Sequence, residues 1–146
     1  MALIYETSNF VLETHDRPEV DRLEGGHMKI SAKFEASDRT QFTPEQAVEF
    51  IGFSIAAGKA MKAAMARQGV EIGRINYQEN GNWNPVFHLH LYGRATTATR
   101  QKYGDPIIPG HQSDFQPLNA EDIALIYEEI DRIITQPDFA PTNWKL

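Results

Sequence analysis

The first third of the chain alternates short apolar runs with turn-forming residues, a pattern typical of β-strands. Residues 3–5 and 10–12 are β-favouring runs separated by the turn-type cluster 7–9, which predicts a hairpin. The polar, proline-containing segment 16–26 predicts a loop. Residues 28–34 then alternate apolar and polar side chains, as expected for a third strand with one buried face.

A helical pattern follows and is the most regular in the sequence. Thr43 is a good N-cap, Pro44 stands at the first helical position, and Gln46 completes the spacing of a capping box. Gly69 is expected just beyond the last helical residue. The stripe predicted to face the core comprises Val48, Ile51, Ile55 and Met61, with Phe50 and Phe53 beside it.

The second half predicts a hairpin followed by a second helix. Residues 70–77 and 86–92 are strand-like and flank the strong turn signal Asn80-Gly81. The proline-containing segment 104–117 predicts a loop, and Asn119 is expected to cap a helix. The buried stripe of this helix is predicted to be Ile123, Ile126, Ile130 and Ile133 or Ile134.

Composition narrows the classes of protein that fit this pattern. A length of 146 residues predicts one domain, and the absence of cysteine excludes disulfides, thiolate metal sites and cysteine nucleophiles. A net charge of −6 argues against general binding to nucleic acid, whose phosphates attract basic surfaces. The first residues do not resemble a signal peptide, and the apolar runs fall short of the roughly 20 residues of a membrane helix. We therefore expect a cytoplasmic protein with no membrane or nucleic-acid partner.

Candidate chemistry is concentrated on one predicted strand. In Val86-Phe87-His88-Leu89-His90-Leu91-Tyr92, apolar and polar side chains alternate strictly. Successive side chains point to opposite faces of a strand, so the apolar members are expected in the core. The other face then carries His88, His90 and Tyr92, all of which donate or accept hydrogen bonds.

Three interpretations fit this strand face. It is a solvated surface that happens to contain histidines, a metal site or a phosphate-binding site. A metal site would need a third ligand besides His88 and His90, which His27, His111 or an acidic residue would supply. The motif alone favours metal and phosphate chemistry equally.

Several further motifs stand in order around this strand. Upstream lie His15-Asp16-Arg17-Pro18, then Gly26-His27-Met28-Lys29-Ile30, then the predicted long helix and the Asn80-Gly81 turn. With His88-Leu89-His90-Leu91-Tyr92, this order over residues 3–94 resembles the histidine triad (HIT) superfamily. The chain is identified as a divergent member in which Tyr92 stands at the position of the third histidine.

This resemblance implies an α+β fold. It would consist of an antiparallel sheet of about five strands, one long helix against the sheet, and a second C-terminal helix. Residues 1–146 would form one domain, with a core at 3–94 and a C-terminal extension at 95–146. Members of the superfamily bind purine nucleotides and are commonly homodimers. Many transfer a nucleoside monophosphate through a nucleotidyl-histidine intermediate, without a cofactor.

The resemblance also implies roles for individual residues. His90 would attack the α-phosphorus, while His88 and His27 would support it; a neutral imidazole is a competent nucleophile when an acceptor, usually a backbone carbonyl, holds its other nitrogen. Among the other substrate contacts, Asp16 would accept hydrogen bonds from the ribose, and Phe10 and Leu12 would line the base pocket. Asn80 in the turn would be a further contact, and Asn84 would lie near the phosphate. Packing is an equal interpretation for Phe10, Leu12 and His27. Arg94 is a candidate polyphosphate contact or, alternatively, a solvated loop residue.

Two departures from the superfamily pattern affect the expected chemistry. Tyr92 can donate a hydrogen bond but cannot exchange a proton near neutral pH, because the usual pKa of a phenol is about 10. Pro85 lacks the N–H and hydroxyl expected just before the strand.

An alternative register, shifted by two residues, would make His88 the middle histidine and Val86 the first. The sequence thus predicts a nucleotidyl hydrolase or transferase, with a nucleotide-binding protein of weak or no catalysis, or a histidine-based metal protein, as alternatives.

Overall fold

Five strands form one antiparallel sheet in the order β1-β2-β3-β5-β4. The computed structural model describes residues 1–110 and 113–139. The strands are β1 (Leu3–Glu6), β2 (Phe10–Thr14), β3 (His27–Ala32), β4 (Ile72–Gln78) and β5 (His88–Ala95), and the helices are α1 (Pro44–Arg67) and α2 (Ala120–Ile134). Short 3-10 turns occupy η1 (Arg22–Glu24), η2 (Arg39–Gln41) and η3 (Pro137–Phe139). The expected α+β architecture is confirmed.

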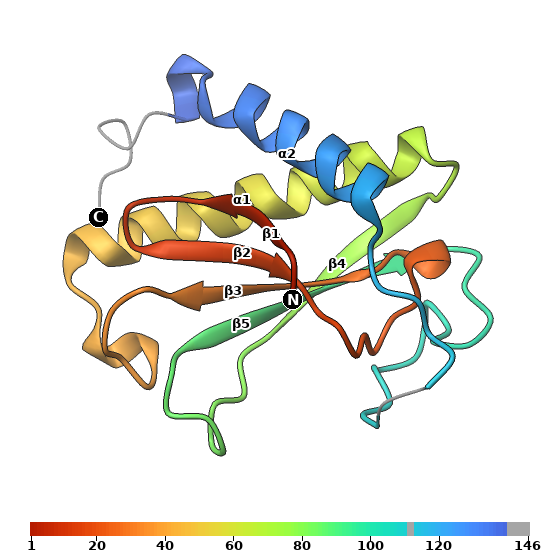
Figure 1. Cartoon of the computed structure of the whole chain (residues 1–146), viewed down its shortest axis with the longest axis horizontal. Coiled ribbons are helices and arrows are strands. Elements are labelled where there is room, and N and C mark those ends of the chain that lie inside the picture. Colours follow the sequence, from red (N-terminus) through yellow and green to blue (C-terminus); the bar gives the residue numbers. More distant parts are fainter. Residues whose placement is uncertain (111–112, 140–146) are drawn as a thin grey trace.

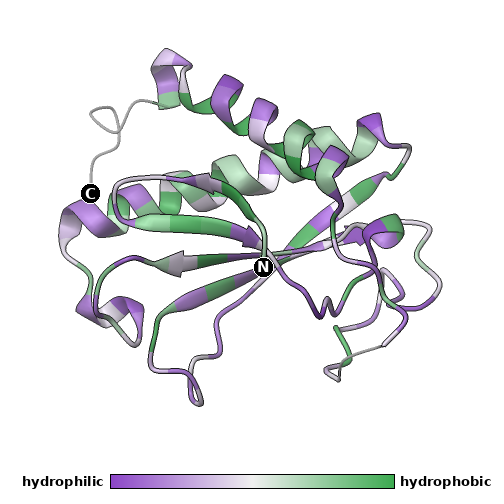
Figure 2. Ribbon diagram, viewed as in Figure 1, coloured by the Kyte–Doolittle hydropathy of each residue, from purple (hydrophilic) through white to green (hydrophobic). Residues whose placement is uncertain are grey.

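The two helices lie on the same side of the sheet. α1 runs along one face, and α2 packs beside α1 and reaches the edge strand β1 (Figure 1). Hydrophobic residues concentrate along β2 and on the side of α2 that faces α1 (Figure 2). The predicted stripe of α2 is largely correct, because Ile126, Ile130 and Ile133 are buried there. The other sheet face is left for the polar members of β3 and β5.

The ends of α1 follow the sequence signals. The Thr43 hydroxyl accepts from the Gln46 N–H, and the Gln46 side chain accepts from the Thr43 N–H. Gln68 is the C-cap, and Gly69 follows with φ of +80°, a conformation that glycine adopts without strain. Local hydrogen bonding therefore set both boundaries, as the sequence predicted.

The buried stripe predicted for α1 is partly wrong. Ile51 and Ile55 are 43% and 37% exposed. Phe50, Phe53 and Met61 are buried as predicted, and they are accompanied by a row of small buried residues: Ala56, Ala57, Ala60 and Ala64. Small side chains let the helix backbone approach the sheet closely, so this face packs better than one rich in isoleucine. Gly58 shows how close the approach is, since a Cβ there would lie 2.3 Å from the Tyr77 hydroxyl.

Within the described ranges 1–110 and 113–139, neither helix combines the length and apolar character needed to cross a bilayer.

A bidentate ion pair joins the loop after β2 to the start of α2. Arg22 Nε and Nη2 donate to the two carboxylate oxygens of Asp122 at 2.7 and 2.9 Å. The Asp122 side chain is fully buried and also accepts from the Asn119 N–H. Because a buried carboxylate without its cation is strongly destabilising, this pair is expected to hold α2 in place.

We expect Arg22→Met to lower the free energy of unfolding by about 3 kcal/mol, because it leaves the Asp122 carboxylate buried without a cation. Urea denaturation followed by circular dichroism measures the change. Lys33→Met is the matched control, since Lys33 pairs with Glu6 at an exposed site and such pairs contribute about 1 kcal/mol or less. Equal losses in the two variants would contradict the assigned role of Arg22.

Candidate functional site

The pairing of β3 with β5 brings the histidines together. His27 lies opposite Tyr92, Lys29 opposite His90, and Ser31 opposite His88. Residues directly opposite each other in an antiparallel pair share a face of the sheet. Leu89 and Leu91 of β5 are buried in the core with α1, so the histidines occupy the face turned away from this helix. The predicted division of β5 into an apolar and an imidazole face is confirmed.

A fifth aromatic ring joins this face from the loop after β2. His15 stacks on His27 with ring centroids 4.4 Å apart and planes within 8° of parallel. The His27 ring also lies 5.0 Å from that of His90 and 4.5 Å from that of Tyr92. We call the set His15, His27, His88, His90 and Tyr92 the imidazole face.

Hydrogen bonds determine where His27 and His90 carry their protons. The Glu19 backbone N–H donates to His27 Nδ1 at 3.2 Å. A nitrogen that accepts has no proton, so neutral His27 carries its proton on Nε2. His27 Nε2 lies 2.9 Å from His90 Nδ1 and donates to it. Neutral His90 therefore carries its own proton on Nε2.

His88 and His15 have the opposite tautomer. His88 Nδ1 lies 2.8 Å from the carbonyl oxygen of Val86, and His15 Nδ1 lies 2.8 Å from that of Arg17. A carbonyl oxygen only accepts, so each ring donates from Nδ1. In their neutral forms, both rings keep a lone pair on Nε2.

Burial keeps the central groups uncharged at neutral pH. It lowers the pKa of His27 to about 2, and the neighbouring His15, His90 and Lys29 contribute in the same direction. Burial likewise lowers the pKa of His90 to about 4, and the neighbouring His88 and His15 contribute in the same direction. The pKa of Tyr92 is raised to about 12, first by burial and then by the negative charge of Glu19. Tyr92 is therefore a hydrogen-bond donor with a firmly held proton.

Two residues predicted to line a base pocket lie elsewhere. Phe10 and Leu12 are fully buried on the α1 side of the sheet, where Phe10 contacts the rings of Phe34, Phe42 and Phe50. These side chains are separated from the imidazole face by the sheet itself. The packing interpretation is therefore the one that the structure supports.

Three other predicted substrate contacts, Asp16, Asn80 and Asn84, are all exposed. Asp16 is exposed, and its carboxylate accepts from the terminal amine of Met1 at 2.7 Å. Asn80 is exposed between β4 and β5, and Asn84 is exposed with its side-chain oxygen accepting from the Val86 N–H. This hydrogen bond lies just before β5 and helps to position Val86, whose carbonyl oxygen accepts from the His88 ring.

Arg94 has a structural environment that neither sequence interpretation anticipated. Its side chain is 2% exposed, and its guanidinium donates to the carbonyl oxygens of Lys102 and Asp105 at 2.6 and 2.7 Å and to the Asn76 side chain at 2.6 Å. It therefore fixes the loop after β5. A phosphate contact from Arg94 would require several of these bonds to break.

Sequence reasoning gave no site role to His15, Lys29 or Glu19. Lys29 lies opposite His90 and places a cation beside the imidazole face. Glu19 has a buried carboxylate oxygen without a hydrogen-bond partner in the described part of the chain. The alternation of residues 27–31 does put Lys29 and His27 on one face, but only the strand pairing reveals which face of β5 they meet.

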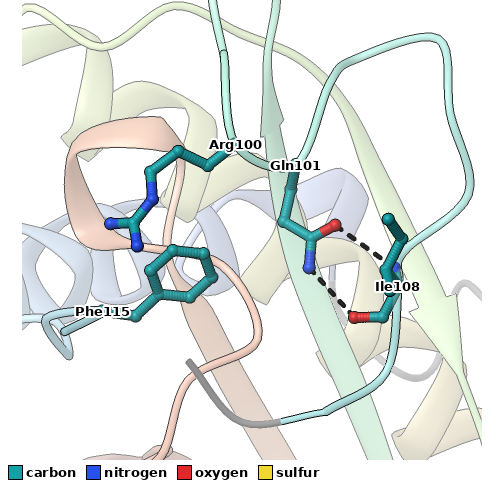
Figure 3. Close-up of a pocket in the computed structure, with 4 residues that line it drawn as sticks. All are labelled: Arg100, Gln101, Ile108 and Phe115. Atoms are coloured by element: carbon teal, nitrogen blue, oxygen red, sulfur yellow. Dashed lines mark hydrogen bonds between the residues drawn. The ribbon is translucent and has the colours of Figure 1, made fainter. Parts of the chain in front are cut away.

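A cavity of about 160 Å³ lies in the segment after β5. It is lined by Arg100, Gln101, Ile108 and Phe115, and the guanidinium of Arg100 lies over the Phe115 ring at 4.0 Å (Figure 3). The Gln101 amide pairs with the backbone of Ile108 and also donates to the carbonyl of Glu19. Gln101 thus links this loop to the segment that orients His27.

The imidazole face also approaches the geometry of a metal site. One ring nitrogen from each of His15, His27 and His90 lies within 4.8 Å of the other two. His88 is not in this set, and His111, a third ligand predicted from the sequence, lies outside the described residues. Two nitrogens on one tetrahedral zinc ion lie about 3.3 Å apart, given bond lengths of about 2.0–2.1 Å. His27 and His90 are closer than this and share a hydrogen bond, which a metal would have to replace.

Comparison with known proteins supports the fold. No protein-family model matches the sequence, and no curated protein matches it. Among solved structures, the chain is similar to a hypothetical histidine triad nucleotide-binding protein from Sulfolobus tokodaii (16% identity, TM-score 0.62, covering 90% of this chain and 85% of that one). It is also similar to a histidine triad protein from Bradyrhizobium japonicum (12%, 0.62, 89% and 87%) and a zinc-bound histidine triad family protein from Mycobacterium smegmatis (23%, 0.54, 90% and 84%). The chain therefore has the fold of histidine triad proteins.

We expect stability to fall as the pH is lowered from 7 towards 4. The folded chain holds His27 and His90 neutral, whereas the unfolded chain protonates both below its ordinary histidine pKa of about 6.5. The unfolded state then binds more protons, so the free energy of unfolding decreases by roughly 1 kcal/mol per pH unit for each imidazole.

Urea titrations at several pH values measure this slope. His27→Gln, which removes one titrating ring, is expected to make it shallower. An equal slope in the variant would show that the His27 imidazole is not held neutral by folding.

Proposed function

We propose that this chain is a nucleotidyl hydrolase or transferase that binds a purine nucleotide derivative on the imidazole face. The supporting observation is the concentration of four imidazoles and a phenol on one sheet face, in a fold shared with a protein described as nucleotide-binding. His27 and His90 are held neutral, and hydrogen bonds fix the orientation of all four imidazole rings, which prepares them for phosphorus chemistry.

The imidazole face and its neighbour Lys29 offer the two kinds of group that phosphoryl transfer needs, namely groups that stabilise the charge of the phosphate and a nucleophile. Lys29 provides a positive charge, while His90 Nε2–H and the Tyr92 hydroxyl provide donors for phosphate oxygens. Such preorganised donors stabilise the charge that develops in the transition state. An imidazole lone pair on β5 is the nucleophile, a role that the resemblance assigns to His90. Its attack on the α-phosphorus forms a nucleotidyl-histidine, which water or another acceptor then cleaves.

The protonation states favour one class of leaving group. His27 and His90 are neutral, and Tyr92 holds its proton tightly. A phosphate leaving group departs as an anion and requires no proton, whereas an amine requires one. Phosphoanhydrides are therefore the expected substrates, with phosphoramidates disfavoured.

The homodimer that the resemblance implies stays a prediction.

We expect the protein to hydrolyse dinucleoside polyphosphates with a kcat/KM at least about tenfold above that for an adenosine phosphoramidate, because only the anhydride releases an anionic leaving group. Chromatographic detection of adenosine monophosphate measures both rates. Turnover of neither substrate, with nucleotide binding seen by calorimetry, would replace the enzyme proposal with a nucleotide-binding protein. Tyr92 and Pro85, the two departures from the superfamily pattern, would account for such a result. An inverted preference would contradict the inferred shortage of proton donors.

Metal binding is the second candidate function. It is supported by the convergence of His15, His27 and His90 and by the zinc described in the Mycobacterium smegmatis protein of the same fold. Imidazole is a preferred ligand of zinc and related transition metals. In this chain, however, the donor from Glu19 and the His27–His90 bond occupy three of the ring nitrogens on which a metal would draw, namely both nitrogens of His27 and Nδ1 of His90.

Dialysis against a chelator is therefore expected to leave nucleotide turnover unchanged. The same preparation is analysed for zinc by mass spectrometry before and after dialysis. Loss of turnover that is restored by one equivalent of Zn²⁺ would favour the metal hypothesis, and His15→Ala would then be expected to weaken zinc binding.

A further inference from the structure

The two histidines of β5 are not chemically equivalent. The His88 ring donates from Nδ1 to the Val86 carbonyl, which leaves the lone pair on Nε2. The His90 ring accepts at Nδ1 from His27 Nε2, which leaves the proton on Nε2. An imidazole attacks phosphorus only through a nitrogen that has a lone pair, and its other nitrogen is best held by an acceptor. His88 meets both conditions.

We infer that His88 supplies the attacking nitrogen and that His90 is a hydrogen-bond donor to the phosphate. This inference rests on the proposed function, and it assigns the nucleophile to a different residue from the one that the sequence resemblance implies. It corresponds to the alternative register, in which Val86 and His88 hold the first and middle positions. The bond from the His88 ring to the carbonyl two residues before it fixes the attacking tautomer.

His90 is held in the other tautomer by a chain of bonds that begins at the backbone. The Glu19 N–H cannot accept, so it places the His27 proton on Nε2. For His90 to attack through Nε2, its proton would have to move to Nδ1. Two N–H groups would then face each other across 2.9 Å, the present distance between His27 Nε2 and His90 Nδ1. His27 is buried, so turning its Nε2–H away from His90 would leave a buried polar group without a hydrogen-bond partner.

His15 also keeps a lone pair on Nε2 but is less well placed. Its ring lies flat against His27, and one of its nitrogens is within 4.8 Å of nitrogens of both His27 and His90. It belongs to the segment after β2, whereas His88 is the first residue of β5 and is fixed by the ladder. The segment 82–86 before His88 is exposed, which leaves an approach for a ligand. A nucleophile on a strand is also held more accurately than one on a loop.

The proposed step balances without an external redox partner or base. The Nε2 lone pair of His88 forms a bond to the α-phosphorus, and the bond from phosphorus to the bridging oxygen breaks. The electron pair leaves with that oxygen, and the product phosphate departs as an anion. His88 is then a nucleotidyl-imidazolium that keeps its proton on Nδ1, where it is hydrogen-bonded to the Val86 carbonyl oxygen. Water attacks the phosphorus, the electron pair returns to Nε2, and the water proton passes to solvent.

The test maps the covalent intermediate. The protein is mixed with diadenosine triphosphate, quenched at alkaline pH, digested, and analysed by electron-transfer fragmentation to locate the adenylyl group. We expect the group on His88. An adenylyl group on His90 or on His15 would overturn the inference and leave the proposed function standing. An absence of both adduct and turnover in the wild-type chain would refute the proposed function itself.

Matched variants separate a nucleophile from a donor. We expect His88→Ala to lose turnover by about 10⁴-fold or more, as for other removed nucleophiles. His90→Ala is expected to lose about 10²- to 10³-fold, as for a removed oxyanion donor. His90→Gln keeps an N–H donor and is expected to recover at least about tenfold over His90→Ala. If His90 were the nucleophile, the glutamine and alanine variants would be equally inactive.

A second measurement guards against variants that fail to fold. Histidine ¹⁵N chemical shifts of the wild-type protein report the protonated nitrogen of each ring. We expect the Nδ1–H tautomer at His88 and the Nε2–H tautomer at His90. The reverse pattern would contradict the inference without any substitution.

Discussion

The pairing of β3 with β5 is the contact on which the site depends. It places His27 opposite Tyr92 and Lys29 opposite His90, so groups more than sixty residues apart in the chain share one sheet face. The hydrogen bond between His27 and His90, at 2.9 Å, crosses this pairing. A shift of register by one residue would turn every side chain to the opposite face, so the ladder itself fixes the chemistry.

Loops outside the sheet determine the direction of that hydrogen bond. The Glu19 N–H sets the tautomer of His27, and the Gln101 side-chain amide donates a hydrogen bond to the Glu19 carbonyl oxygen. Gln101 lies in a loop that is held in turn by the buried guanidinium of Arg94 and by the Glu24 carboxylate, which accepts from the backbone N–H groups of residues 99–101. The segment after β5 thus contributes to the site through backbone anchoring.

Desolvation explains why an imidazole-rich face is compatible with this fold. Four neighbouring imidazolium ions would repel one another, and the nearby Lys29 would add to the repulsion. Burial disfavours the charged forms of His27 and His90, so the rings pack as neutral aromatic groups that still exchange a hydrogen bond. The same neutrality limits the supply of protons for a leaving group. The stability of the site and its expected substrate class therefore have one physical origin.

The sequence by itself determined the features that depend on local structure. Capping at Thr43 and Gln46, the glycine after α1, the Asn119 cap and the strict alternation of residues 86–92 all act over a few residues, and all appear in the structure. The side of α1 that faces the core was determined only in part. Phe50, Phe53 and Met61 are buried as predicted, but Ile51 and Ile55 are exposed, because packing against the rest of the fold selects among the apolar positions of a helix. Likewise, the composition of the imidazole face could be read in part from β5, but the contribution of His15 and the proton positions could not. These depend on donors such as the Glu19 N–H, which come close only when distant segments pack together. Tertiary structure alone decided which imidazole keeps a free lone pair, because a tautomer is set by the partner across the hydrogen bond and not by the neighbours in the chain.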